Sequence, residues 1–263
     1  MSGLYCFGRR FISAVILALV VLAGWSQAAD PQPGGIDPQA EKLLRRMSDY
    51  LASRRQFSLK SESTLEAVLT SGQKLQYDSP ATLVVSRPNK LWGHRRGDLA
   101  NQEFFYNGKT LTLYNPKENL YATTAAPATL DEMFDFAREK LDVIAPGTDL
   151  LYTNAAEKML KASSSVFVVG PSVVAGVKTT HLAFRTADVD GQIWIDDGDK
   201  PLPRKFTLTS KQVKGEPQFT IVIRSWDLAP KVTDQMFTFV PPKGAKKIEF
   251  LNLTDAAAKP QPK

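Results

Sequence analysis

The stretch that decides the fold is FFYNGKTLTLYNP, residues 104–116. Its Asn107-Gly108 pair favours a two-residue turn whose twist matches that of the flanking antiparallel strands. Side chains alternate between the two faces of a strand, and threonines fill most of one face here. The turn therefore predicts a hairpin whose other face is apolar and carries Phe104, Tyr106, Leu111 and Leu113.

Outside this hairpin the apolar pattern has two different periods. A period of two, typical of strands, begins at Phe57 and returns between residues 166 and 226. Helical periodicity covers 38–51, where Asp37 can cap the helix and proline suits its first position. Thr129-Leu130-Asp131-Glu132 is a capping box for a helix expected over 129–145, stopped by Pro146-Gly147. A shorter helix is expected at about 154–160.

This order of elements predicts a mainly β protein with helices, of the α+β class. About eleven antiparallel strands cannot stay flat in one sheet, so we expect a strongly curved, incomplete barrel with helices covering its concave face. The expected organisation is a signal peptide over 1–28, a flexible leader over 29–36, a single domain over 37–252 with a helical insert at 129–161, and a disordered tail over 253–263.

The N-terminal segment has the composition of an export signal. Arg9 and Arg10 precede an apolar core, Phe11 to Gly24, and the small residues Ser26 and Ala28 suit cleavage near Ala28. Trp25 stands where a lipoprotein would carry its acylated cysteine. We therefore expect a periplasmic protein with no stable membrane anchor. An uncleaved N-terminal anchor is the alternative.

The residue inventory offers little for catalysis, metal binding or nucleic-acid binding. The only cysteine, Cys6, lies in the signal, and without Arg9 and Arg10 the net charge falls from +6 to +4, spread along the chain. His94 and His181 lack the helical spacing of metal-ligand pairs. The acids of 188–191 and 196–199 could bind calcium, but they are also ordinary hairpin-turn chemistry. The sequence predicts no catalytic residue, no metal site, no cofactor and no nucleic-acid partner.

The strands carry more apolar surface than one thin core needs. Trp92, Trp194 and Trp226 fall on faces opposite neighbouring aliphatic residues. Helix cover and sheet twist are one explanation, and an apolar cavity deep enough for a lipid chain is the other. The residues expected to line such a cavity are Leu65, Leu69, Leu83, Phe104, Tyr106, Leu111, Leu113, Phe134, Phe184, Ile193, Phe206 and Ile221.

Several segments resemble a known family. They are SRPNKL at 86–91, YNGKTLTLYNP at 106–116, YAT at 121–123 with PATLDEM at 127–133, QIWID at 192–196 and DQMFTFVPPKG at 234–244. They resemble a family of predicted periplasmic proteins of unknown function that is grouped with the lipoprotein carriers LolA and LolB. The resemblance covers about residues 36–250. It implies a half-barrel holding an apolar cavity under a helical lid, but the gating arginine and membrane-inserting loop of the carriers have no counterpart here.

Two main hypotheses follow. The first is a non-enzymatic periplasmic protein that binds or carries an apolar ligand, such as a lipid or a lipoprotein acyl chain. The second is an envelope interaction or sensor protein that docks another envelope protein or a lipoprotein, for example by adding a strand to an open sheet edge. A hydrolase is the third and least supported hypothesis.

Overall fold

A computed structural model describes residues 34–99, 101–143 and 145–250 of the chain. The predicted signal peptide, most of the predicted leader and the predicted tail lie outside these residues. The helices are α1 Pro38–Ala52, α2 Leu130–Leu141 and α3 Ala155–Ala162, and two short 3-10 helices are η1 Thr148–Leu151 and η2 Asp234–Phe237. No described helix has the length and apolar character needed to cross a bilayer.

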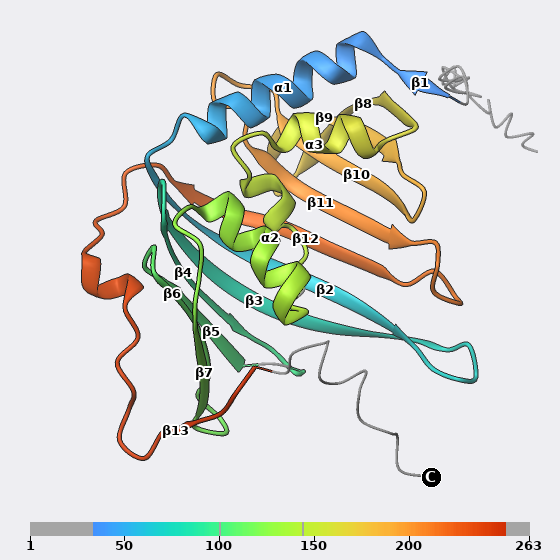
Figure 1. Ribbon diagram of the computed structural model, residues 1–263. Coiled ribbons are helices and arrows are strands. Elements are labelled where there is room, and N and C mark those ends of the chain that lie inside the picture. The colour runs from blue at the N-terminus through green and yellow to red at the C-terminus, as the bar shows by residue number, and fades with distance from the viewer. Residues whose placement is uncertain (1–33, 100, 144, 251–263) are drawn as a thin grey trace, which may run out of the picture. The chain divides into compact units, whose positions relative to one another are not determined.

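The strands form one curved sheet that does not close (Figure 1). They are β1 Gly35–Ile36, β2 Gln56–Val68, β3 Lys74–Ser86, β4 Lys90–Arg96, β5 Asn101–Tyr106, β6 Thr110–Asn115, β7 Leu120–Ala125, β8 Ser165–Val174, β9 Val177–Arg185, β10 Val189–Asp196, β11 Pro203–Ser210, β12 Gln218–Asp227 and β13 Lys246–Lys247. Their order in the sheet is β1-β8-β9-β10-β11-β12-β2-β3-β4-β5-β6-β7-β13.

The described residues thus form thirteen strands, where the sequence predicted about eleven. The two outermost strands, β1 and β13, have only two residues each and pair in parallel with β8 and β7. Pieces this short carry no periodicity, so no pattern could predict them. Gly35 was expected in a flexible leader, and instead it begins β1 with a φ of 123° that suits glycine. Both edges of the sheet are therefore covered in part by the chain itself.

The local predictions around the central hairpin and the helix starts are confirmed. Phe104 lies opposite Leu113 and Tyr106 opposite Leu111, so these four residues share one face as predicted. The register differs from that of a two-residue Asn107-Gly108 turn, which would pair Tyr106 with Lys109, because the backbone N–H of Asn107 bonds to the Thr110 carbonyl and the turn falls at 108–109. The Asp37 side chain accepts a hydrogen bond from the backbone N–H of Gln39 at the start of α1 (2.8 Å). At α2, the Thr129 hydroxyl oxygen accepts from the backbone N–H of Glu132 (3.3 Å).

The end of α2 was predicted wrongly. The helix ends at Leu141 rather than at 145, because Asp142 takes the left-handed conformation, with a φ of 53°, that closes a helix C-terminus. The third helix starts at Ala155, close to the predicted position, and runs to Ala162. The 3-10 helix η1 lies between them and was not predicted.

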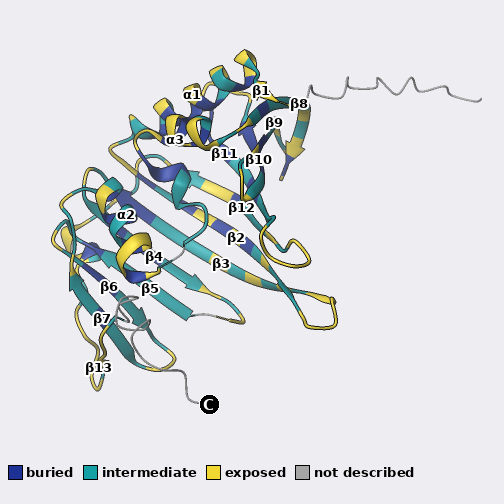
Figure 2. Cartoon of the chain, turned by 45° about the vertical axis from the view of Figure 1, so that its right-hand side comes forward, coloured by how far each residue is buried: buried dark blue, intermediate teal, exposed yellow. Residues whose placement is uncertain are grey.

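The helices pack against the sheet through two buried clusters, which we call the α2 core and the α1 core. The α2 core joins α2 and η1 to β2–β6 and contains Phe57, Val85, Leu91, Tyr106, Leu111, Leu130, Met133 and Phe134. The α1 core joins α1 and α3 to β8–β11 and contains Leu44, Met47, Met159, Leu182, Phe184, Ile193 and Phe206. Figure 2 shows dark, buried stretches under both groups of helices.

Candidate functional site

A cavity of about 360 Å³ lies between the sheet and the segment from α2 to η1. The sheet side comes from β2–β6 with β11 and β12, and the helix side from α2 and residues 145–152. Apolar residues dominate the lining: Leu59, Ala81, Leu83, Leu91, Phe104, Leu111, Met133, Phe134, Ala137, Val143, Ala145, Pro146, Leu150, Leu151, Pro203, Leu208, Phe219, Ile221, Ile223 and Trp226. This volume is at the lower end of the range usual for small-molecule sites.

Small residues on three neighbouring strands create the space. Ser61 and Ser63 take two successive inward positions of β2, where larger apolar residues would fill the core. Ser61 lies opposite Ala81 of β3, and Gly93 of β4 lies opposite Leu83. The Ser63 hydroxyl donates a hydrogen bond to the Ser79 carbonyl (3.1 Å), so its polar atom is satisfied within the sheet. The short side chains on this part of β2–β4, which we call the floor of the cavity, leave space between the sheet and α2.

Two strand glycines show how this floor differs from the packed end of the same face. A Cβ atom on Gly191 would lie 1.9 Å from Cζ of Phe184, so the aromatic ring occupies the space above that glycine. A Cβ on Gly93 would meet only Leu83 Cδ1 at 3.3 Å and Thr82 O at 3.9 Å before Phe104 Cβ at 4.0 Å. Gly191 is thus covered by an aromatic ring, whereas Gly93 lines the cavity.

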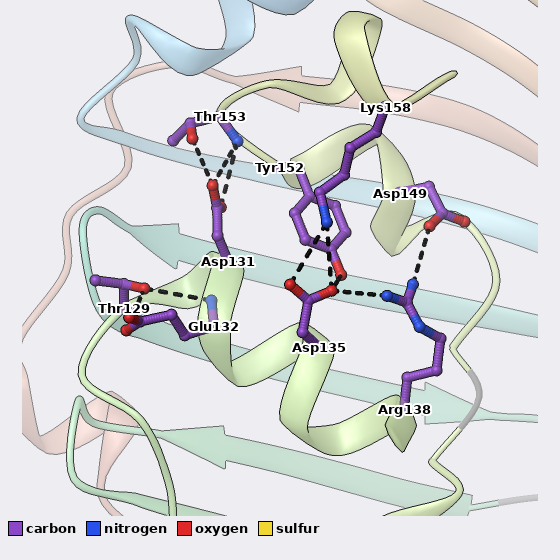
Figure 3. A network of polar contacts seen from close by, with 9 residues as sticks. All are labelled: Thr129, Asp131, Glu132, Asp135, Arg138, Asp149, Tyr152, Thr153 and Lys158. Atoms are coloured by element: carbon purple, nitrogen blue, oxygen red, sulfur yellow. Dashed lines mark hydrogen bonds and ion pairs between the residues drawn. The ribbon is translucent and has the colours of Figure 1, made fainter. Parts of the chain in front are cut away.

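Polar contacts hold the helix side of the cavity together (Figure 3). The Asp135 carboxylate accepts a hydrogen bond from the buried Tyr152 hydroxyl (2.8 Å) and lies 2.7 Å from the Arg138 guanidinium and 3.3 Å from Lys158 Nζ. Arg138 also lies 3.8 Å from Asp149 of η1. These contacts link α2 to η1 and α3, so the three elements form one cover.

Two pKa shifts follow from this packing. Burial favours the neutral form of Asp135, but the hydrogen bonds from Tyr152 and Lys158 and the charges of Lys158 and Arg138 outweigh it and lower the pKa of Asp135. Burial, together with the hydrogen bond to Asp135, raises the pKa of Tyr152. Asp135 is therefore an anion and Tyr152 a neutral hydrogen-bond donor at neutral pH.

The structure brings five of the twelve predicted residues to the cavity: Leu83, Phe104, Leu111, Phe134 and Ile221. Tyr106 is fully buried in the α2 core, where its hydroxyl donates to the Pro127 carbonyl, and Leu113 packs against that core. Phe184, Ile193 and Phe206 belong to the α1 core. Leu65 and Leu69 lie toward the β2–β3 hairpin and are each 42% exposed. Strand alternation identified the face, but it could not say which part of that face the helices cover.

Among the tryptophans outside the predicted signal peptide, Trp226 lines the cavity and its indole N–H donates to the Pro203 carbonyl (3.1 Å). Trp194 lies on the other face of the sheet, stacked on His181 with 4.1 Å between ring centroids. Sequence reasoning missed Ser61, Ser63 and Gly93. The glycine did leave a signal, because a glycine inside an apolar strand often marks the close approach of a ligand or another chain segment.

The family model described as predicted periplasmic protein (DUF2092) matches residues 40–251, which confirms the family resemblance of the sequence. No curated protein matches the sequence. Similar solved structures include an uncharacterised conserved protein from Thermus thermophilus, at 11% identity and a TM-score of 0.48, covering 80% of this chain and 99% of that one.

Two further solved structures are similar to this chain, also at low sequence identity. LprF from Mycobacterium bovis is 12% identical, with a TM-score of 0.46, and the match covers 80% of this chain and 99% of that one. A LolA superfamily protein from Nitrosomonas europaea is 10% identical, with a TM-score of 0.35, and the match covers 76% and 97% of the two chains.

Proposed function

We propose that this chain, which belongs to the DUF2092 family of predicted periplasmic proteins, binds an apolar ligand in the cavity between its sheet and α2. The ligand would be a lipid or a single acyl chain, and the protein would act in the periplasm without catalysing a reaction. The observation that carries this proposal is the cavity itself, whose floor is kept low by Ser61, Ser63 and Gly93 and whose walls are mainly aliphatic and aromatic.

The volume limits the size of the ligand. If a methylene takes about as much space as the ~30 Å³ share of a water molecule, a cavity of about 360 Å³ holds about 12 chain carbons. One acyl chain fits, whereas the two or three chains of a larger lipid would have to extend outside.

The expected affinity follows from this length. Twelve methylenes contribute about 10 kcal/mol at ~0.8 kcal/mol each. Association costs at least ~4 kcal/mol, so at most about 6 kcal/mol remains, which corresponds to a Kd of tens of micromolar or weaker. Apolar contact alone therefore predicts measurable but weak binding.

A displacement assay tests the proposal. The neutral fluorophore N-phenyl-1-naphthylamine should bind the delipidated mature protein, and dodecanol should displace it. Gly93→Leu fills the floor of the cavity and should reduce both signals strongly while the protein remains folded by circular dichroism. Lys178→Leu, which adds the same side chain at an exposed strand position, is the control and should bind like the wild type. A folded wild-type protein that binds neither fluorophore nor dodecanol would overturn the proposal.

A further inference from the structure

One cation on the cavity wall lacks an acidic partner. Arg95 lies on β4, two positions from Gly93, and strand alternation places its side chain on the same face as Gly93. It lies directly opposite Gln102 of β5, and its Nη2 donates to Gln102 Oε1 (2.8 Å). Its Nε is buried and has no hydrogen-bond acceptor among the residues that the structure describes.

The charges around the cavity do not cancel. Its charged lining residues are Arg95, Arg138 and Asp149. Arg138 is neutralised by Asp135 at 2.7 Å and by Asp149 at 3.8 Å. Arg95 belongs to none of the ion pairs found within 4.0 Å across residues 34–99, 101–143 and 145–250. The wall of an apolar cavity therefore carries one positive charge with only a neutral amide beside it.

Such a charge has a physical cost. Burial lowers the pKa of Arg95, yet an arginine stays protonated in proteins, so it cannot escape this cost by losing its proton. The Arg95 side chain is half-buried, with its Nε fully buried, and charges that lose contact with water are normally paired with an opposite charge. Gln102 uses one hydrogen of the five that a guanidinium can donate, so donors remain for a further acceptor.

These observations extend the proposed function, on which this step rests, to the head group of the ligand. We infer that the cavity takes a single-chain amphiphile with an anionic head, such as a fatty-acid carboxylate, whose oxygens accept hydrogen bonds from the Arg95 guanidinium while the chain lies over Gly93 and Phe104. A guanidinium has a planar arrangement of N–H donors that can bind either a carboxylate or a phosphate, so both head groups are compatible with Arg95.

Ligands with the same chain and different heads test this inference. Dodecanoate, dodecyl phosphate and dodecanol would each displace N-phenyl-1-naphthylamine from the mature protein at pH 8. A hydrogen bond to a charged group favours the anions, so at least one of them should bind about 10- to 100-fold more tightly than dodecanol. The ratio between the two anions identifies which head the site prefers.

Arg95→Met keeps an unbranched apolar stem and removes the guanidinium with its charge. In this variant the advantage of the anions should vanish, while dodecanol binds as in the wild type. Arg96→Met removes a charge at the next position, on the opposite face of β4, and should leave the advantage unchanged. Arg95→Lys keeps the positive charge, so the anions should still bind more tightly than dodecanol, but by a smaller factor than in the wild type.

Each outcome separates the two proposals. If dodecanol and both anions bind the wild type equally, the anionic head is wrong and the apolar cavity stands. If the anions keep their advantage in Arg95→Met, the charge that attracts them is not that of Arg95. If no chain displaces the fluorophore, both proposals fail. The wild-type comparison decides the head group even where Arg95→Met does not fold.

Discussion

Adding one methyl group should destabilise the protein clearly at one strand glycine, Gly191, and change its stability little at another, Gly93. Gly191 and Gly93 both lie inside strands on the helix-covered face of the sheet, and neither has a positive φ. An alanine Cβ at Gly191 would lie 1.9, 2.3 and 2.4 Å from three ring carbons of Phe184. At Gly93 the closest atom would be Leu83 Cδ1 at 3.3 Å, the end of a side chain that borders the cavity.

The two substitutions should change the free energy of unfolding by different amounts, because only Gly191 has a ring packed over it. Gly191→Ala must move the Phe184 ring, which is buried between α1 and the sheet, and overpacking of this kind costs about 1–3 kcal/mol. If the ring leaves the core altogether, the cost approaches the ~3–5 kcal/mol of a lost phenylalanine. Gly93→Ala only shifts Leu83 by a few tenths of an ångström into open space. It also restricts the unfolded chain, which stabilises by ~0.4–1 kcal/mol, so the net change should stay within about 1 kcal/mol.

Urea unfolding of protein that begins at Ala29, the predicted mature N-terminus, followed by far-ultraviolet circular dichroism, measures both changes. Gly191→Ala should lower the midpoint clearly with an unchanged slope, and Gly93→Ala should not. Phe184→Leu is the matched background, because without the ring the penalty of Gly191→Ala should shrink. Equal stability of Gly191→Ala and Gly93→Ala would refute the reasoning, since it would mean that Phe184 does not fill one end of this face while the other end stays hollow.

Three further predictions concern the cover and the N-terminus. Phe134→Ala should cost about 3–5 kcal/mol in urea unfolding and the loss of the Thr129 cap only ~1, and equal costs would contradict a docked α2. The pKa of Asp135 is lower in the folded protein than the ordinary aspartate value of 3.8. Its ionised carboxylate therefore stabilises the folded state at pH values above 3.8, and this contribution is lost as the pH falls through the pKa of the folded state. Asp135→Asn should therefore be less stable than the wild type at pH 7, by less than about 1 kcal/mol because the carboxylate is partly exposed, and the gap should close below pH 3.8; a gap that persists in acid would contradict this. N-terminal sequencing of protein from the periplasm should start at or next to Ala29, whereas full-length or acylated protein in the membrane fraction would show that the signal is not cleaved as predicted.

The features that the sequence predicted well depend on neighbours in the chain. The shared apolar face of the hairpin around Asn107-Gly108 and the caps Asp37 and Thr129 are determined within a few residues, so the local sequence identifies them. The end of α2 was harder, because Asp142 adopts a left-handed conformation that the sequence marks only weakly. The edge strand β1 depends on β8, about 130 residues away in the chain, and nothing local to Gly35 indicates that pairing.

The position of the cavity depends on contacts of the same long-range kind. Large apolar residues on alternating strand positions do line part of the cavity, but Phe184 and its neighbours fill their own space in the α1 core. The hollow lies where large side chains are missing, at Ser61, Ala81 and Gly93, and these residues come together only through the register of three strands. A serine or a glycine in one strand is unremarkable, but several of them side by side under a helix leave a volume that the protein cannot fill itself. For this reason a charge such as that of Arg95, placed beside the hollow, is informative about what enters it.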